Sequence, residues 1–279
     1  MLFSGIHFNF SFGETLINEL FPACGKEDFL ERKNALYLRL AKWVIRYSWL
    51  IVYLTAASPL FDPSFFTEDR EKHLNRYASA RCSEIGYNNP FLPIMDYTDL
   101  KTYISSIEGY VERKEIIVPS ELYYPVRLKS GGANSLVTLG ETGVHRIELR
   151  MIDLNPLSDA GIFEEDIAFL HLFLLYLTEQ KDFDFTKDMQ EKAIHKMYRS
   201  ALFDNADFQE EAYDFLKKIK EHFKDSLSDE YNYALDYQLE KITSPEKQYA
   251  FRVRKLFGSR FTEQGFALSK QAAAKICGK

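Results

Sequence analysis

The stretch RIELRM, residues 146–151, decides the fold of this chain. Charged and apolar side chains alternate strictly along it, which predicts a β-strand with one buried face and one polar face. Arg146, Glu148 and Arg150 then stand on the polar face, about 6.5–7 Å apart. A carboxylate placed there can hold a divalent cation while a neighbouring guanidinium takes charge from a phosphoryl group. A salt-bridge ladder on a solvated sheet face would give the same pattern.

The stretch SGIHFNFSF, residues 4–12, alternates in the same way. It predicts a strand whose isoleucine and phenylalanines are buried and whose opposite face carries His7, Asn9 and Ser11. A neutral imidazole can coordinate a divalent cation, although Mg²⁺ prefers oxygen, so His7 is a candidate metal ligand. The alternative is an ordinary half-exposed strand that binds nothing.

The remaining chain predicts strands first and helices afterwards. Residues 115–128 and 143–154 are strand-like, and the SGGAN run at 130–134 between them is a turn signal. After Pro156, helix-compatible segments rich in Lys, Glu, Leu and Ala cover residues 164–178, 188–203, 207–223, 229–241 and 246–275. This order indicates an α+β fold. We find no linker between domains and predict one domain, 1–279, with sheet and loops in 1–156 and helices in 157–279.

Two helices are expected among the strands of the first half. Apolar residues at helical spacing predict one helix over residues 27–57, ended by Ser58-Pro59, and another that begins at Asp96. Between them, residues 61–93 are dense in Pro, Gly, Asn and Ser and predict a long irregular connection. Such long connections inside a domain are often functional.

The composition excludes two classes of protein. The chain has 279 residues, of which 46% are hydrophobic and 15% aromatic, so it can bury a sizeable core and is not disordered. Its net charge is −6, without a local cluster of Lys and Arg. Nucleic acid is therefore not an expected partner.

Cysteine usage and hydropathy indicate a cytoplasmic protein. Cys24, Cys82 and Cys277 are far apart and lack the paired spacing of a zinc site or a disulfide framework. The first twelve residues lack the positive region and cleavage site of a signal peptide. The most apolar stretch, residues 49–57, is shorter than the roughly 20 residues of a spanning helix, so we expect no membrane association.

Two further stretches carry candidate binding residues. In ASARCSEIGY, residues 78–87, Arg81 offers a fork suited to an amino-acid carboxylate and Tyr87 a hydroxyl donor for a pocket wall. Tyr87 could equally be a loop anchor packed on the core. In ELYYPVR, residues 121–127, Tyr123 and Arg127 would share one strand face, whereas Tyr124 points the other way and is expected in the core.

Together these stretches resemble the bacterial glutamate-cysteine ligases, which belong to the glutamine synthetase superfamily. RIELR at 146–150, followed by Asp153 and Asn155-Pro156, is similar to a run shared across the superfamily. The Ser-x-Arg-x-Ser-x-x-Gly-Tyr pattern of residues 79–87 narrows the resemblance to the glutamate-cysteine ligases. Residues 121–127 also look like their Glu-Leu-Tyr-x-Pro-x-Arg strand, and the ordered match runs over residues 4–156.

The resemblance implies a glutamine-synthetase-like catalytic domain with an antiparallel sheet. It implies ATP-dependent ligation of the γ-carboxyl of glutamate to cysteine through γ-glutamyl phosphate, the first step of glutathione biosynthesis, with Mg²⁺ or Mn²⁺. In the family's roles His7 and Glu148 would hold the metal and Arg150 would contact the phosphates. The corresponding cysteine-binding residues are Arg81, Tyr87 and Tyr123, with Arg127 as a further candidate.

The sequence departs from this family at its start. Family members carry, before the strand that matches residues 4–12, a portion that supplies further metal-binding carboxylates and part of the cysteine pocket. The match begins at that strand, so we expect the chain to lack the family's N-terminal part. One His and one Glu cannot by themselves complete a cluster of octahedral Mg²⁺ ions, so either the other ligands come from elsewhere or catalysis is crippled. An exposed strand edge would follow, covered by self-association or by a partner chain. The alternatives are a catalytically incomplete remnant or subunit, or a related ligase that uses another amine.

Overall fold

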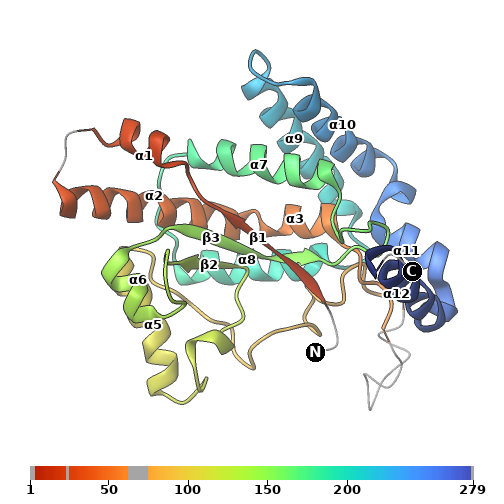
Figure 1. Cartoon of the computed structure of the whole chain (residues 1–279), viewed down its shortest axis with the longest axis horizontal. Coiled ribbons are helices and arrows are strands. Elements are labelled where there is room, and N and C mark those ends of the chain that lie inside the picture. Colours follow the sequence, from red (N-terminus) through yellow and green to blue (C-terminus); the bar gives the residue numbers. More distant parts are fainter. Residues whose placement is uncertain (1–3, 23–24, 62–74, 278–279) are drawn as a thin grey trace.

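The structure, a computed structural model, describes residues 4–22, 25–61 and 75–277. Within these ranges a three-stranded antiparallel sheet has the order β1-β3-β2, so the RIELRM strand lies at its centre (Figure 1). The strands are β1 (Gly5–Phe10), β2 (Val126–Lys129) and β3 (Arg146–Asp153). The predicted strands at 4–12 and 143–154 and the α+β class are confirmed.

Helices surround the sheet and make up most of the chain. The apolar face of the sheet packs on α2 and α3, and Ile147 and Leu149 of β3 are fully buried there. The helices of the first half are α1 (Glu14–Leu20), α2 (Lys26–Arg46), α3 (Ser48–Thr55), α5 (Leu100–Glu112) and α6 (Leu136–Thr142). Those of the second half are α7 (Glu164–Thr178), α8 (Lys187–Ser200), α9 (Gln209–Phe223), α10 (Asp229–Thr243), α11 (Tyr249–Phe257) and α12 (Phe261–Cys277).

The helical second half follows the sequence prediction closely. α7 coincides with the predicted helix 164–178, and α8, α9 and α10 lie within three residues of theirs. The predicted helix 246–275 is wrong as one element, because the backbone of Gly258 (φ +48°) separates α11 from α12. Short 3-10 helices, η3 (Ala206–Phe208), η4 (Pro245–Lys247) and η5 (Gly258–Arg260), connect these helices.

The first half contains two corrections. A strand over 115–128 is wrong except at its end, since Pro119 starts the 3-10 helix η2 (Pro119–Glu121) and the strand begins only after Pro125. Proline has no N–H to give to a sheet ladder, which explains the late start. The segment after the SGGAN turn forms α6, which was not expected. The predicted helix 27–57 is interrupted at Tyr47 into α2 and α3.

The helix predicted to begin at Asp96 begins four residues later. Asp99 is the N-cap of α5, and it forms a capping box with Thr102. Of the irregular connection at 61–93, the part from residue 75 onward lies along the site described below, and residues 62–74 lie outside the described residues. No helix in the described ranges is long and apolar enough to cross a membrane.

A buried polar network ties the second half to α3. Asp166 of α7 accepts hydrogen bonds from Lys241 Nζ (3.0 Å), Gln238 Nε2 (2.9 Å) and Tyr249 Oη (2.8 Å). Lys241 Nζ also donates to the carbonyl oxygen of Leu54 at the end of α3 (2.8 Å). Since Asp166 and Lys241 are almost completely buried, their charges must be paired for the helices to pack.

Candidate active site

The polar face of the sheet is built by the strand register. Asn9 of β1 and Arg127 of β2 both pair with Glu148 on the central strand β3. Two residue pairs further along, on the same face, Lys129 is opposite Arg146. Glu148 therefore stands in the middle of a face on which cations predominate.

A β-bulge interrupts the pairing of β1 with β3 beside His7. Ile6 pairs with Ile152 and Phe8 with Leu149, so Arg150 and Met151 fall opposite the single residue His7. Bulges re-aim side chains and are frequent next to active sites. Here the bulge brings both Arg150 and Met151 to the cavity that also reaches His7.

Glu148 is surrounded by three basic side chains. Its carboxylate oxygens lie 3.6 Å from Lys129 Nζ, 3.6 Å from Arg150 Nε and 3.9 Å from His7 Nδ1. The side chains of Glu148, Lys129 and Arg150 are only 10–15% exposed. The sequence pattern predicted that Arg146 and Arg150 would flank Glu148. In the structure Arg150 and Lys129 do so, whereas Arg146 Nε donates to Asn9 Oδ1 (3.1 Å).

The electrostatics of this cluster favour an additional anion. Burial lowers the pKa of Lys129, and burial together with the nearby Arg127 lowers the pKa of Arg150 to about 10. Burial also lowers the pKa of His7, against the opposing effect of Glu148, so the imidazole is neutral at pH 7. Arg150 Nε, although buried, has no hydrogen-bond partner among the described residues. An anionic ligand would satisfy it.

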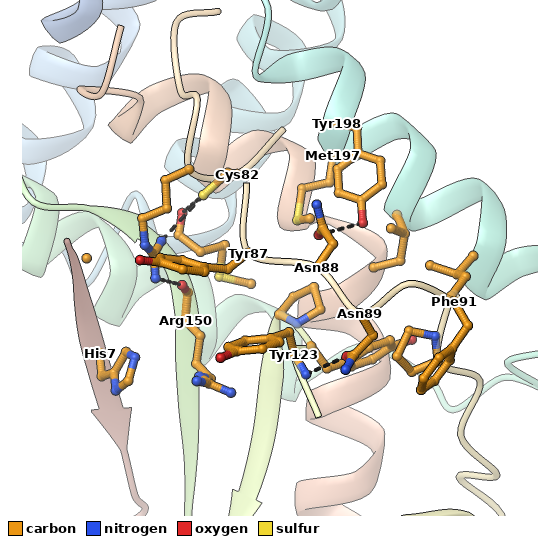
Figure 2. A pocket seen from close by; sticks show the side chains of 18 residues that line it. His7, Cys82, Tyr87, Asn88, Asn89, Phe91, Tyr123, Arg150, Met197 and Tyr198 are labelled. Carbon is orange, nitrogen blue, oxygen red and sulfur yellow. Dashed lines mark hydrogen bonds between the residues drawn. The ribbon is translucent and has the colours of Figure 1, made fainter. Parts of the chain in front are cut away.

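A cavity of about 230 Å³ opens beside this cluster (Figure 2). Typical ligand clefts measure about 300–1,000 Å³, so this one suits a ligand of amino-acid size better than a nucleotide. Cationic groups line one part of it, and sulfur-containing, aromatic and aliphatic side chains line the rest. The cavity-lining residues include His7, Arg81, Cys82, Tyr87, Tyr123, Arg150, Met151, Ile194, Met197 and Tyr198.

Arg81 lines the cavity and also holds the bulge. Its guanidinium donates to the carbonyl oxygens of Arg150 (2.5 Å) and Ile152 (3.2 Å) and to Cys82 Sγ (3.5 Å). These bonds use three of its five N–H groups. Arg81 packs so closely against positions 5 and 86 that only glycine fits there. A Cβ on Gly5 would lie 2.2 Å from Arg81 Cζ, and one on Gly86 would lie 1.9 Å from the carbonyl oxygen of Arg81.

Tyr87 and Tyr123 form the aromatic wall of the cavity. Their rings stack with centroids 5.8 Å apart and an interplanar angle of 20°. The Arg150 guanidinium lies beside the Tyr123 ring, 5.9 Å from its centroid, within reach of a cation–π contact (Figure 2). Tyr124 is 6% exposed, as expected of a core residue. Burial raises its pKa.

Two predicted site residues, Glu148 and Arg127, do not line this cavity. Glu148 lies in the adjacent cationic cluster, and Arg127 supports the cavity from outside. The guanidinium of Arg127 donates to the carbonyl oxygens of Ser120 (2.6 Å) and Leu122, and thereby holds the segment that carries Tyr123. Other residues of the site were not predicted, among them two that line the cavity and one in the adjacent cationic cluster. Met197 and Tyr198 come from α8, whose sequence shows only an amphipathic helix. Lys129 could have been found, because it shares a strand face with Arg127 by the two-residue period.

His7 and Glu148 are the two residues available to a metal. Two atoms that each bind one Mg²⁺ at about 2.0–2.1 Å can lie at most about 4.2 Å apart, so their 3.9 Å separation allows a shared ion. In the described part of the chain, no group of three or more His, Cys, Asp or Glu side chains could hold a metal. Oxygens of phosphate, water or another protein segment would have to complete the octahedron.

Two solved structures match this fold over nearly the whole chain. A glutamate-cysteine ligase from Francisella tularensis, in complex with AMP, matches with a TM-score of 0.80 and 17% identity over 97% of this chain and 63% of its own. A bifunctional glutathione synthetase from Pasteurella multocida matches with a TM-score of 0.79 and 27% identity over 96% of this chain and 36% of its own. The fold is thus that of a glutamate-cysteine ligase.

The sequence comparison names the family. The family model for glutamate-cysteine ligase matches residues 1–117 and 111–199, so this chain belongs to the glutamate-cysteine ligase family. The glutathione biosynthesis bifunctional protein GshAB of Listeria monocytogenes is 33% identical over 297 aligned residues. That match covers 95% of this chain but 37% of the relative, so the chain spans little more than a third of that relative's length.

Proposed function

We propose that this chain performs the ATP-dependent ligation of the γ-carboxyl of glutamate to the amine of cysteine, the first step of glutathione biosynthesis. One observation carries the proposal. Arg150 lies at the boundary between an amino-acid-sized cavity and a buried cationic sheet face, and its Nε has no hydrogen-bond partner in the described ranges. A reaction that joins an amino acid to a phosphate-activated carboxylate needs these two subsites side by side.

The cavity is assigned to cysteine. The two N–H groups of Arg81 for which no bond is found among the described residues bind the cysteine carboxylate, with Tyr87 and Tyr123 as the aromatic wall. Met151 and Met197 give the thiol a polarizable apolar surface. Arg127 supports this subsite from outside by holding the Tyr123 segment.

The cationic face is assigned to the phosphates and to glutamate. The γ-carboxylate of glutamate takes the γ-phosphoryl group of ATP, which releases ADP and leaves an acyl phosphate. The amine of cysteine then attacks the acyl carbon, the C–O bond to phosphate breaks, and inorganic phosphate leaves as the amide forms. Arg150 stabilises the transferring phosphoryl group, so the protein contributes positioning and charge and needs no nucleophile of its own.

A divalent cation, Mg²⁺ or Mn²⁺, would neutralise phosphate charge when bound between His7 and Glu148. His7 can serve because its lowered pKa keeps the imidazole neutral at pH 7. Lys129 lies 3.6 Å from the same oxygen of Glu148, so it must move aside or share that oxygen. Glu148 is therefore the residue on which metal binding depends.

A reducing cytoplasm is the setting that we propose. Cys82 is a free, buried thiol on the cavity wall. Burial raises its pKa to about 12, so it remains protonated and unreactive beside a thiol substrate.

A second candidate is a ligase subunit that is incomplete by itself. This candidate is favoured because His7 and Glu148 are too few to complete a metal site, and the described residues contain no group of three or more His, Cys, Asp or Glu that could hold a metal ion. In those residues β1 pairs only with β3, so its outer edge can take another strand. A partner or a second copy bound there would bring side chains close to His7. A monomer by light scattering with full activity would exclude completion in trans.

The decisive experiment incubates the chain with ATP, Mg²⁺ or Mn²⁺, glutamate and cysteine and measures phosphate and dipeptide. We expect both products, and we expect Glu148→Ala to abolish them. Activity that survives Glu148→Ala refutes the site. Cysteine binding without turnover supports the incomplete subunit, and phosphate release stimulated by another amine in place of cysteine supports a related ligase.

A further inference from the structure

Two consecutive residues, Asn88 and Asn89, bond the loop that carries Tyr87 to two opposite walls of the cavity. Asn88 bonds to α8 on one side, and Asn89 bonds to the segment before β2 on the other (Figure 2). Neither residue was singled out by the sequence pattern. Both line the cavity.

Asn89 makes a pair of bonds to one stretch of backbone. Its Oδ1 accepts from the backbone N–H of Tyr123 (2.8 Å), and its Nδ2 donates to the carbonyl oxygen of Glu121 (2.9 Å). Tyr123 lies 34 residues after Asn89 in the chain. Pro119 and Pro125 have no N–H to give to a sheet ladder, and the Asn89 side chain supplies hydrogen bonds to the backbone between them. The bonds fix where the Tyr123 backbone stands relative to Tyr87, two residues before Asn89.

Asn88 fixes the same loop to the opposite wall. Its Oδ1 accepts from the hydroxyl of Tyr198 on α8 (2.8 Å), and its Nδ2 donates to the carbonyl oxygens of Ser83 (3.0 Å) and Glu84 (3.3 Å). With α8 and the Tyr123 segment both tied to one loop, the width of the cavity is set by two neighbouring side chains. An asparagine can do this because it offers both a donor and an acceptor.

The position of Tyr123 has two consequences for the site. Its ring stacks on Tyr87 at 5.8 Å, and the Arg150 guanidinium lies 5.9 Å from its centroid. Arg150 Nη1 also approaches the carbonyl oxygen of Leu122 (3.5 Å), the residue just before Tyr123. A shift of this segment would therefore displace the aromatic wall and the arginine together.

We propose that Asn89 is a positioning residue, which acts through Tyr123 to hold the amino-acid cavity in its binding geometry. The proposal rests on the proposed function for its ligand, L-cysteine. The side chain of Asn89 bonds to backbone atoms of Glu121 and Tyr123, so its effect on ligand binding is indirect. Losing the pair of bonds should weaken L-cysteine binding by about tenfold, the range of one or two hydrogen bonds.

The test compares three variants of the full chain. Asn89→Ala removes both bonds, and Asn89→Asp keeps an acceptor for the Tyr123 N–H while losing the donor to Glu121. Asn34→Ala is the matched control, because Asn34 Oδ1 accepts from the backbone N–H of Val144 (2.8 Å) at the other end of β3. Calorimetry gives the Kd of L-cysteine, and hydrogen exchange gives the protection of the Tyr123 amide without any ligand.

We expect Asn89→Ala to lose protection at Tyr123 and to bind L-cysteine about tenfold more weakly, Asn89→Asp to retain most of both, and Asn34→Ala to bind as the wild type does. Binding by Asn89→Ala within twofold of the wild type overturns the proposal, as does equal weakening by Asn34→Ala. A wild-type chain that does not bind L-cysteine refutes the proposed function instead. In that case loss of protection at Tyr123 in Asn89→Ala still supports the structural role of Asn89, and unchanged protection overturns it.

Discussion

Replacing Glu148 by Gln tests the electrostatic centre of the site directly. The substitution keeps the shape of the side chain and removes the negative charge that lies 3.6 Å from Lys129 and 3.6 Å from Arg150. At an effective dielectric constant of about 20, each of these contacts is worth roughly 4–5 kcal/mol before desolvation. The desolvation of Glu148, which the wild type must overcome, offsets a large part of this sum.

The net result expected for Glu148→Gln is a loss of about 3 kcal/mol, the lower end of the range for breaking a buried ion pair. For a chain of this size that corresponds to a fall in Tm of roughly 6–12 °C. The loss arises because two cations whose side chains are only 10–15% exposed remain without their counter-charge. Thermal unfolding by circular dichroism, with urea unfolding as a check, measures it.

Glu211→Gln is the matched control for this experiment. Glu211 pairs with Lys196 at 2.5 Å, but both side chains are at least one-third exposed, so the expected loss is below about 1 kcal/mol. If Glu148→Gln unfolds within 2 °C of the control (about 1 kcal/mol or less), the cluster is effectively hydrated and the reasoning fails. If it is destabilised and phosphate then restores part of the loss, the excess of positive charge is confirmed as an anion site.

Three further predictions concern single groups. Arg150→Lys keeps the charge but loses the fork, so ligase activity should fall by about 10²–10³ in a phosphate-release assay with normal folding. Lys241→Met breaks the buried network of α7 and should cost about 3–5 kcal/mol in urea unfolding, against less than 1 kcal/mol for the exposed Lys192→Met. His7 should titrate below pH 6.5 by NMR, because burial lowers its pKa, and lower still in Glu148→Gln, because Glu148 is the neighbour that raises it.

The two-residue period in the sequence was enough to assign the faces of β1, and those of β3 as far as Arg150. His7 and Asn9 are exposed and Phe10 is buried, as alternation requires. Alternation fails at residues 115–125 because prolines interrupt the ladder, and only the last part of that stretch forms a strand. The break between α11 and α12 depends on the backbone of a single glycine, which a helix-compatible composition conceals.

The cavity itself could be predicted only in part, because it is assembled from segments far apart in the sequence. Arg81, Tyr87 and Tyr123 were identified from their motifs, and all three line it. Met197 and Tyr198 belong to α8, and nothing in an amphipathic helix indicates which residues of its buried side will reach a ligand. Long-range packing, rather than local pattern, decides such contributions.

The bulge in β3 shows how pairing changes the meaning of a motif. In an unbroken ladder Arg150 and Met151 would point to opposite faces, and only one of them could reach the cavity. The register shift between Ile6 and Phe8 brings both to it, and Arg81 stabilises the irregularity by bonding the carbonyl oxygens of Arg150 and Ile152. Replacing Arg81 would therefore disturb the position of Arg150 as well as any contact with a ligand. A lost activity in such a variant therefore cannot be assigned to substrate binding alone.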